Sequence, residues 1–198
     1  MSRTLPLPLL PLRAVMFPAG LLHITVTAAP AMALLQRCHD DNGVFGVSWL
    51  QTMADGAHRP AEVGVVARVE TLAAHEHGLR VSCLARHRVR IDGQAERDDA
   101  GRWSCQARIL DDDAALTPDA TMFPAVQALG RAIVSMRVGG QVSVRQPYRL
   151  DDAGWVANRW CELLPISLEA KQRLMVLMDP RARLALVDAY LREQRIVR

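Results

Sequence analysis

Histidine and cysteine side chains are the ones in this chain best suited to metal binding or nucleophilic catalysis, and they are scattered. His75 and His77 would share one face of a strand, but they fall in an expected hairpin turn, and the sequence places no further ligand beside them. The run Cys38-His39-Asp40 sets a thiol beside a base, yet adjacent residues of a helix do not face each other. Neither group predicts a site, so we expect no metal-binding residue and no thiol nucleophile.

His87 and Lys171 are the two other candidates for proton transfer. His87 falls on the apolar face of an expected strand, where a core histidine with satisfied hydrogen bonds is commoner than a base. Lys171 is the only lysine and lies in a helix that we expect to be exposed, whereas a catalytic lysine must be desolvated to lose its proton. No segment matches the phosphate-binding pattern of two glycines with four residues between them, followed by lysine and then serine or threonine. We therefore predict no catalytic residue, no cofactor and no enzymatic activity.

Arginine recurs at even positions of residues 80–91, which is the most regular polar pattern in the chain. The odd positions from Val81 to Ile91 are mostly apolar, so the period of two predicts a strand with one apolar and one basic face. A basic face of this kind can bind phosphates or acidic peptides. The favoured alternative is a solvated face paired with acids such as Glu96. The candidate binding residues are Arg80, Arg86, Arg88 and Arg90.

Composition bounds the class of protein. The chain has 198 residues, half of them hydrophobic, which suffices for one large domain or two small ones, and its net charge of only +3 does not make it a polycation. The four cysteines lie far apart in sequence, as expected for buried thiols in a reducing cytosol rather than for disulfides or zinc. Prolines interrupt the apolar start, which argues against a signal peptide, and no apolar run is long enough to cross a membrane. We expect a cytoplasmic protein without a membrane partner.

Strand patterns fill the first part of the chain and helix patterns fill the second. About seven strands and one helix precede the acidic run at residues 111–113, and about four amphipathic helices follow it. Alternating leucine and proline over residues 4–12 predict an edge strand or extended arm, because proline lacks the N–H that a strand ladder needs. The order predicts an α+β fold with a β-rich subdomain over residues 1–115, including one helix, and an α-helical subdomain over residues 116–198.

Four segments, in order, resemble the substrate-binding N-terminal domain of Lon proteases in its stand-alone bacterial form. Residues 5–20 look like the family's LPL-x-PLR opening and its FPG-type turn, and residues 63–69 look like its VGT-x-A-R-I strand. Residues 78–91 look like the strand pair that ends in G-x-x-R-x-x-I, and residues 163–184 look like the helical tail. The chain departs from the family at residues 27–32, which lack the F-E-P-R-Y signature, and at Ala19 and Ala85, where glycine is usual.

The resemblance implies a small mixed β-barrel of the PUA-like type followed by a C-terminal helical bundle. It also implies a non-catalytic module that binds unfolded or partner polypeptides, like the recognition domain of ATP-dependent Lon protease but without ATPase or protease domains. Such segments would contact apolar patches at the cleft between barrel and helices. The alternative, by analogy with PUA-like folds, is nucleic-acid binding through the arginine face, although only nine aromatic side chains are available for base stacking. The sequence leaves the oligomeric state open.

Overall fold

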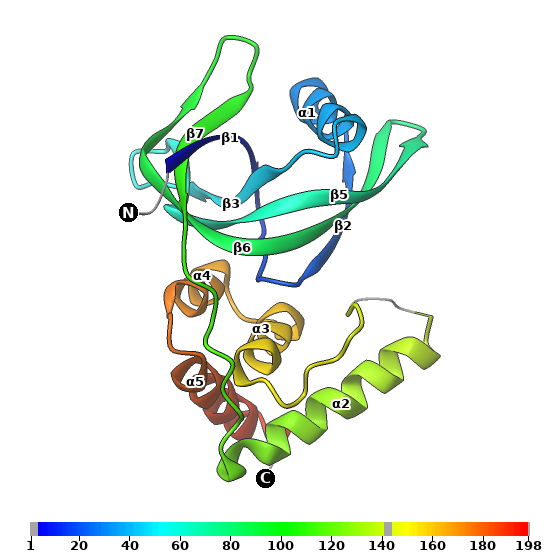
Figure 1. Cartoon of the computed structure of the whole chain (residues 1–198), viewed down its shortest axis with the longest axis vertical. Coiled ribbons are helices and arrows are strands. Elements are labelled where there is room, and N and C mark those ends of the chain that lie inside the picture. Colours follow the sequence, from blue (N-terminus) through cyan, green and yellow to red (C-terminus); the bar gives the residue numbers. More distant parts are fainter. Residues whose placement is uncertain (1–3, 141–143, 198) are drawn as a thin grey trace. The chain divides into compact units, whose positions relative to one another are not determined.

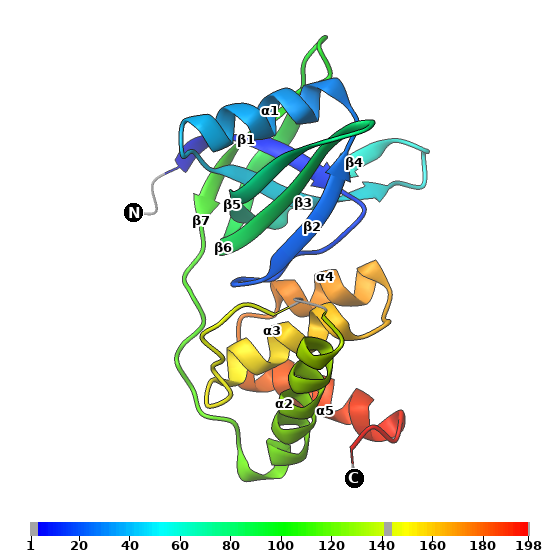
Figure 2. The same ribbon diagram turned by 90° about the vertical axis from the view of Figure 1, so that its right-hand side faces the viewer.

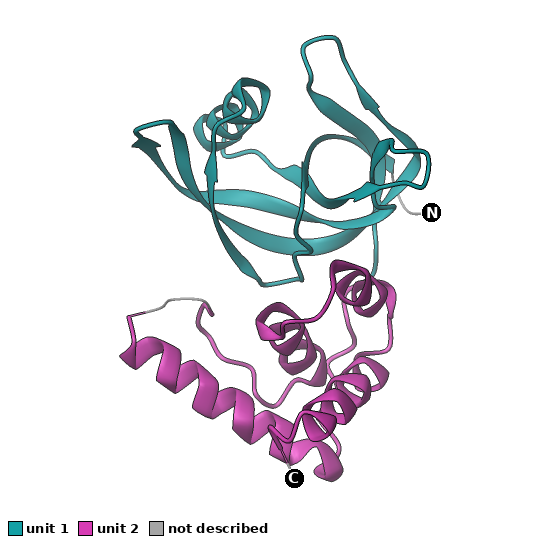
Figure 3. Ribbon diagram, turned by 180° about the vertical axis from the view of Figure 1, so that it is seen from behind, with its two compact units in different colours: residues 1–111 teal, residues 112–198 magenta. Residues whose placement is uncertain are grey.

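The computed structural model describes residues 4–140 and 144–197 of the chain and divides it into two compact units (Figure 3). The first unit, residues 1–111, contains the strands and one helix, and the second, residues 112–198, contains the remaining helices. The predicted α+β organisation, with strands first and helices last, is confirmed. In the part of the chain that the structure describes, no helix is long and apolar enough to span a membrane.

The first unit is built on one seven-stranded sheet with a single helix beside it (Figures 1 and 2). The strand order is β1-β7-β6-β5-β3-β4, β2 pairs with β6, and β1 also pairs with β3. The pairing of β1, β7, β6, β5 and β3 therefore forms a closed circuit. The elements are β1 (Thr4–Leu12), β2 (Leu21–Val26), α1 (Ala29–Asp40), β3 (Phe45–Thr52), β4 (His58–Pro60), β5 (Val63–His75), β6 (Gly78–Arg97) and β7 (Trp103–Ile109).

Strand β1 pairs with β7 and with β3, so the prediction of an edge strand or extended arm fits only the half that contains Pro6 and Pro8. Residues 4–9 pair antiparallel with β7, and residues 9–12 pair in parallel with β3. Pro6 and Pro8 lie in the half that precedes the register with β3, where a missing N–H on that side costs no ladder bond. The prolines therefore lie where β7 is the only partner of β1, and Leu9 is the residue at which the registers with β7 and β3 overlap.

The 20-residue strand β6 carries an inserted residue relative to β5, which disturbs the alternation of its side chains locally. Val65 pairs with Arg88 but Ala67 pairs with Ala85, so β6 advances one residue more than β5 between these pairs. Because side chains alternate with a period of two, an inserted residue breaks this alternation where it occurs. Next to the insertion, Arg88 is buried, at 1% exposure, and His87 is exposed. Beyond it, Val89 and Ile91 are buried and Arg90 is exposed, as the alternation predicted. The predictions of a basic face at Arg88 and of a core position at His87 are both wrong for this reason.

The second unit contains four α-helices whose ends follow local capping chemistry. The Ser167 hydroxyl accepts the Ala170 N–H at 3.1 Å, and the Asp179 carboxylate accepts the Arg181 and Ala182 N–H groups at 2.9 and 3.1 Å. Ser167 and Asp179 therefore cap the helices that follow them. The elements are η1 (Ala120–Met122), a short 3-10 turn, followed by α2 (Phe123–Val138), α3 (Ala153–Leu163), α4 (Leu168–Val176) and α5 (Pro180–Glu193).

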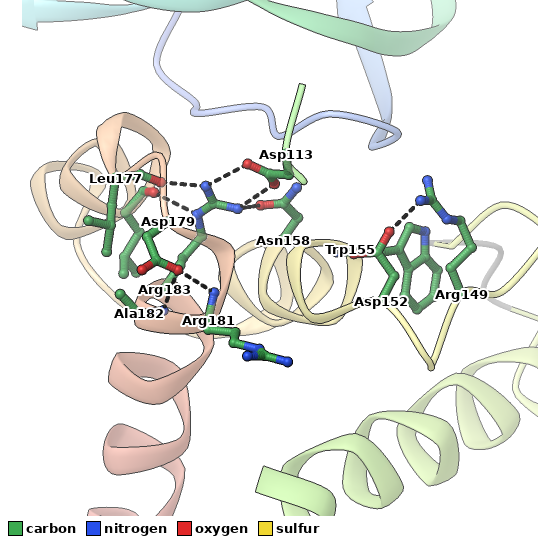
Figure 4. A network of polar contacts seen from close by, with 11 residues as sticks. Asp113, Arg149, Asp152, Trp155, Asn158, Leu177, Asp179, Arg181, Ala182 and Arg183 are labelled. Carbon is green, nitrogen blue, oxygen red and sulfur yellow. Dashed lines mark hydrogen bonds and ion pairs between the residues drawn. The ribbon is translucent and has the colours of Figure 1, made fainter. Parts of the chain in front are cut away.

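Arg183 lies at the centre of the helical unit with its guanidinium fully buried (Figure 4). Its Nη1 atom donates to Asp113 Oδ2 at 2.7 Å and to Asn158 Oδ1 at 3.0 Å, and its Nη2 atom donates to Asp113 Oδ1 at 3.1 Å and to the Leu177 carbonyl oxygen. Its Nε atom donates to the Leu174 carbonyl oxygen at 3.0 Å. All five N–H donors are used, so one side chain fastens the start of the unit, α3, α4 and α5 together.

Replacing Gly64 by alanine should destabilise the β-rich unit by at least about 2 kcal/mol. A β-carbon at Gly64 would lie 2.2 Å from the carbonyl oxygen of Val47, and this backbone atom of the neighbouring strand cannot swing aside. At Gly43 the nearest atom would be 3.7 Å away, so Gly43→Ala is the matched control, with an expected change below about 0.5 kcal/mol. Urea titration followed by circular dichroism measures both variants, and equal midpoints would contradict the expectation.

Replacing Asp113 by alanine should lower the free energy of unfolding by about 3–5 kcal/mol, because it leaves a buried guanidinium without its carboxylate. The control is Asp111→Ala, which removes an exposed acid two residues earlier in the same segment. Thermal unfolding measures the two variants against the parent chain. A midpoint for Asp113→Ala that matches the Asp111→Ala midpoint would show that the buried ion pair contributes little.

Candidate functional site

The first hollow of interest is a groove of about 270 Å³ in the β-rich unit, lined by β1, α1 and the β6–β7 hairpin. Figure 1 shows this hairpin rising beside α1. Pro8 and Leu10 from β1, with Ala31 and Leu34 from α1, contribute apolar lining. The charged residues of the lining are all arginines, namely Arg37, Arg97 and Arg102. We call this hollow the α1 groove.

The tip of the β6–β7 hairpin is held by Asp98. Its carboxylate accepts the backbone N–H of Arg102 at 2.8 Å and the Nε–H of the same residue at 2.7 Å. These two bonds, the backbone one first, hold the pKa of Asp98 below its ordinary value. Gly101 supplies the positive φ of 79° that closes the turn. This turn places Arg102 at the groove.

Arg97 and Trp103 face each other across the base of this turn, as paired residues of β6 and β7. The guanidinium carbon of Arg97 lies 5.9 Å from the centre of the Trp103 ring, which is a cation–π contact. Both residues line the α1 groove and also a second hollow of about 480 Å³. Arg97 and Trp103 therefore form part of the wall of both hollows.

The second hollow arises where β6 leaves its register with β7, and we call it the β4 hollow. Asp92 pairs with Gln106 but Glu96 pairs with Ser104, so two extra residues of β6 stand between these pairs. Gly93, with φ at 77°, begins the irregular stretch. The lining of the β4 hollow carries charges of both signs, because it includes the acid Glu62 and the base Arg59. It also includes the half-exposed side chain of Met53.

The arginines singled out from the sequence do not gather at these hollows. Arg80, Arg86 and Arg90 are exposed along β6, and none of them lines either hollow. Ten residues of strand separate the first from the last, a span of up to about 30 Å. Arg88 is buried and its backbone carbonyl accepts the N–H of Leu110 at 2.9 Å. A binding role for the three exposed arginines stays a prediction.

The cysteines are buried thiols, as the sequence predicted. None of the four forms a disulfide. Burial raises the pKa of Cys83 to about 12, of Cys161 to about 12 and of Cys105 to about 11. Burial also raises the pKa of Cys38. A thiolate is the reactive form of cysteine, so these environments disfavour nucleophilic chemistry.

Lys171 is half-buried, contrary to the expectation of an exposed residue. Its Nζ atom donates to the carbonyl oxygen of Glu162 at 3.1 Å, and burial lowers its pKa. His77 lies 3.9 Å from the Glu76 carboxylate, with both side chains strongly exposed. Over residues 4–140 and 144–197, no three His, Cys, Asp or Glu residues are grouped closely enough to hold a metal ion.

The sequence did not predict that Arg37, Arg97, Arg102 and Trp103 line one groove. One signal was present: a turn over residues 98–101 sets Arg97 opposite Trp103 once the strands pair. The contribution of Arg37 had no such signal, because it depends on where α1 packs.

Comparison with known proteins gives one family and a consistent fold. The family model of the ATP-dependent protease La (LON) substrate-binding domain matches residues 6–193. The crystal structure of a Lon N-terminal domain protein from Xanthomonas campestris is similar at a TM-score of 0.74 and 25% identity, covering 94% of this chain and 98% of that chain. The N terminal domain of the Mycobacterium avium complex Lon protease has a TM-score of 0.68 at 16% identity, covering 95% of this chain and 98% of that one, a likeness of fold alone. No curated protein sequence matches the chain.

The folded protein should contain no rapidly reacting thiol at pH 8. With a pKa near 11, only about one Cys105 side chain in a thousand is a thiolate at that pH. Burial raises the pKa of the other three thiols as well, so they too stay protonated. Titration with a chromogenic disulfide reagent should show slow reaction in buffer and four rapid equivalents in urea. One fast equivalent in the native protein would indicate an activated cysteine and reopen a nucleophilic role.

Proposed function

Because this chain belongs to the family of Lon protease substrate-binding domains, we propose that it recognises segments of other polypeptides and performs no chemistry on them itself. The family match extends over residues 6–193, so it includes both the β-rich and the helical unit. The description of the family names substrate binding, and the hollows of the β-rich unit offer the surface on which it would occur here.

The α1 groove is the observation that best supports polypeptide recognition. Polypeptide segments bind in grooves that take apolar side chains inside and leave polar groups at the rim. The groove has this composition, with Leu10 and Leu34 in the lining and arginines as its charged members. Trp103 and arginine are also the residue types on which binding energy concentrates at protein interfaces.

The absence of chemistry in this proposal is supported by the state of the thiols. Burial favours the protonated form of Cys38, Cys83, Cys105 and Cys161, which is the unreactive form. The half-buried Lys171 donates a hydrogen bond to a backbone carbonyl oxygen, which gives its ammonium group a structural role.

Nucleic-acid binding has less support. The exposed arginines Arg80, Arg86 and Arg90 are spread along one strand and line neither hollow. Single-stranded nucleic acids need aromatic faces for their bases. The Trp103 ring is already covered by the Arg97 guanidinium.

Filling the α1 groove should weaken polypeptide binding. Ala31 lines the groove and is half-buried, so Ala31→Trp should raise the dissociation constant at least about tenfold by occupying the space of an anchor side chain. The probe is fluorescein-labelled α-lactalbumin, reduced and carboxymethylated to keep it unfolded, with binding measured by fluorescence anisotropy. The matched control is Ala33→Trp, the same change at an exposed position on the same helix that lies outside the lining.

The two parts of the proposal have separate readouts. Gel electrophoresis of the probe after incubation with ATP and Mg²⁺ should show an intact chain. Equal weakening by Ala31→Trp and Ala33→Trp would remove the groove as the binding surface. Failure of the parent protein to bind the probe at all would overturn polypeptide recognition.

A further inference from the structure

We propose that the α1 groove selects polypeptide segments in which acidic side chains alternate with apolar ones. The inference rests on the proposed function and names the chemistry of its partner. It is carried by the charge of the groove, by its apolar lining and by the contrast with the β4 hollow.

The charge of the α1 groove has a single sign. The described residues that line it include three arginines and no carboxylate. One of them, Arg102, forms an ion pair with Asp98 at 2.7 Å, with side chains 60% and 42% exposed. Arg97 instead lies over the ring of Trp103, and Arg37 projects from the exposed face of α1. A segment with carboxylates at its rim would therefore meet cations along both walls, because Arg37 is on the helix and Arg97 is on the hairpin.

The apolar part of the lining requires apolar side chains between those carboxylates. Pro8 and Pro11 of β1 and Pro30 and Ala31 of α1 are half-buried and present apolar surface to the groove, with the buried Leu10 and Leu34 behind them. Leucine or a similar side chain removes this surface from water, which a purely acidic chain cannot do. A nucleic acid would satisfy the arginines but would leave the apolar lining uncovered, so the composition favours a polypeptide.

The β4 hollow gives the internal contrast. Its lining contains the acid Glu62 as well as Arg59 and Arg97. Arg59 also lies 3.5 Å from the carboxylate of Asp55. The arginines of the β4 hollow would attract an acidic segment and the carboxylate of Glu62 would repel the same segment. We therefore assign the selection for acidic partners to the α1 groove.

The experiment compares three labelled peptides of twelve residues that share leucine, glycine and serine positions. The first carries four aspartates, the second replaces them with asparagines, and the third replaces them with lysines. Each exposed ion pair changes affinity by about 1.5–5-fold, so the aspartate peptide should bind about tenfold more tightly than the asparagine peptide, and the lysine peptide should bind most weakly. Raising the NaCl concentration from about 50 to about 500 mM should narrow the differences in affinity among the three peptides, because salt screens exposed charges.

Reversing one groove charge should reverse the preference in part. Arg37→Glu should weaken the aspartate peptide about tenfold and leave the asparagine peptide within about twofold. Arg37→Gln, which removes the charge without adding an acid, should give an intermediate loss. The matched control is Arg131→Glu, the same substitution at an exposed position of α2, which should leave all three affinities unchanged.

The outcomes separate this inference from the proposed function. Equal binding of the aspartate and asparagine peptides would overturn the selection for acids while the unfolded α-lactalbumin probe still binds. Failure of both the peptides and that probe would overturn polypeptide recognition as well. Displacement of the aspartate peptide by an equal concentration of a twelve-nucleotide single-stranded RNA, lost in Arg37→Glu, would identify the groove as a nucleic-acid site and sink the inference.

Discussion

The β-rich unit depends on one long strand. β6 runs for 20 residues and pairs with β2, β5 and β7, and no straight strand can serve three partners in a closed circuit of pairing. Local insertions let it bend: one extra residue against β5 near Arg88, and two against β7 after Asp92. The insertion near Arg88 also breaks the alternation of buried and exposed side chains at that point. The path of the sheet and the chemistry of its surface therefore have one physical cause.

The candidate site is a product of that path. β6 continues past the sheet into the hairpin with β7, whose tip is held by the Asp98 carboxylate and whose base is held by Arg97 over Trp103. The irregular stretch after Asp92 opens the β4 hollow on one side of this hairpin, and the packing of α1 leaves the α1 groove on the other. A hairpin with contacts at both its tip and its base suits the proposed recognition surface, because less order must be gained when a segment binds.

The helical unit is organised by a different constraint, the burial of Arg183. A buried guanidinium is costly unless every donor is used, and here Asp113, Asn158 and two backbone carbonyls use all five. Gly154 makes the approach of Asp113 feasible, because a β-carbon at that position would lie 2.7 Å from Asp113 Oδ2. The geometry of the helices thus follows from one satisfied charge as well as from their apolar faces.

The sequence by itself determined the elements and their order. Capping at Ser167 and Asp179, the proline that begins α1, and the turn at Asp98 act within a few residues, so they could be read locally, and four motif segments pointed to the family. Only the tertiary structure decided which side chains meet. Burial of Arg88 follows from an insertion that exists only in the register with β5, and Arg37 joins Arg97 only because α1 packs beside the hairpin. Strand register and helix packing are long-range contacts, and a period of two along one strand carries no record of either.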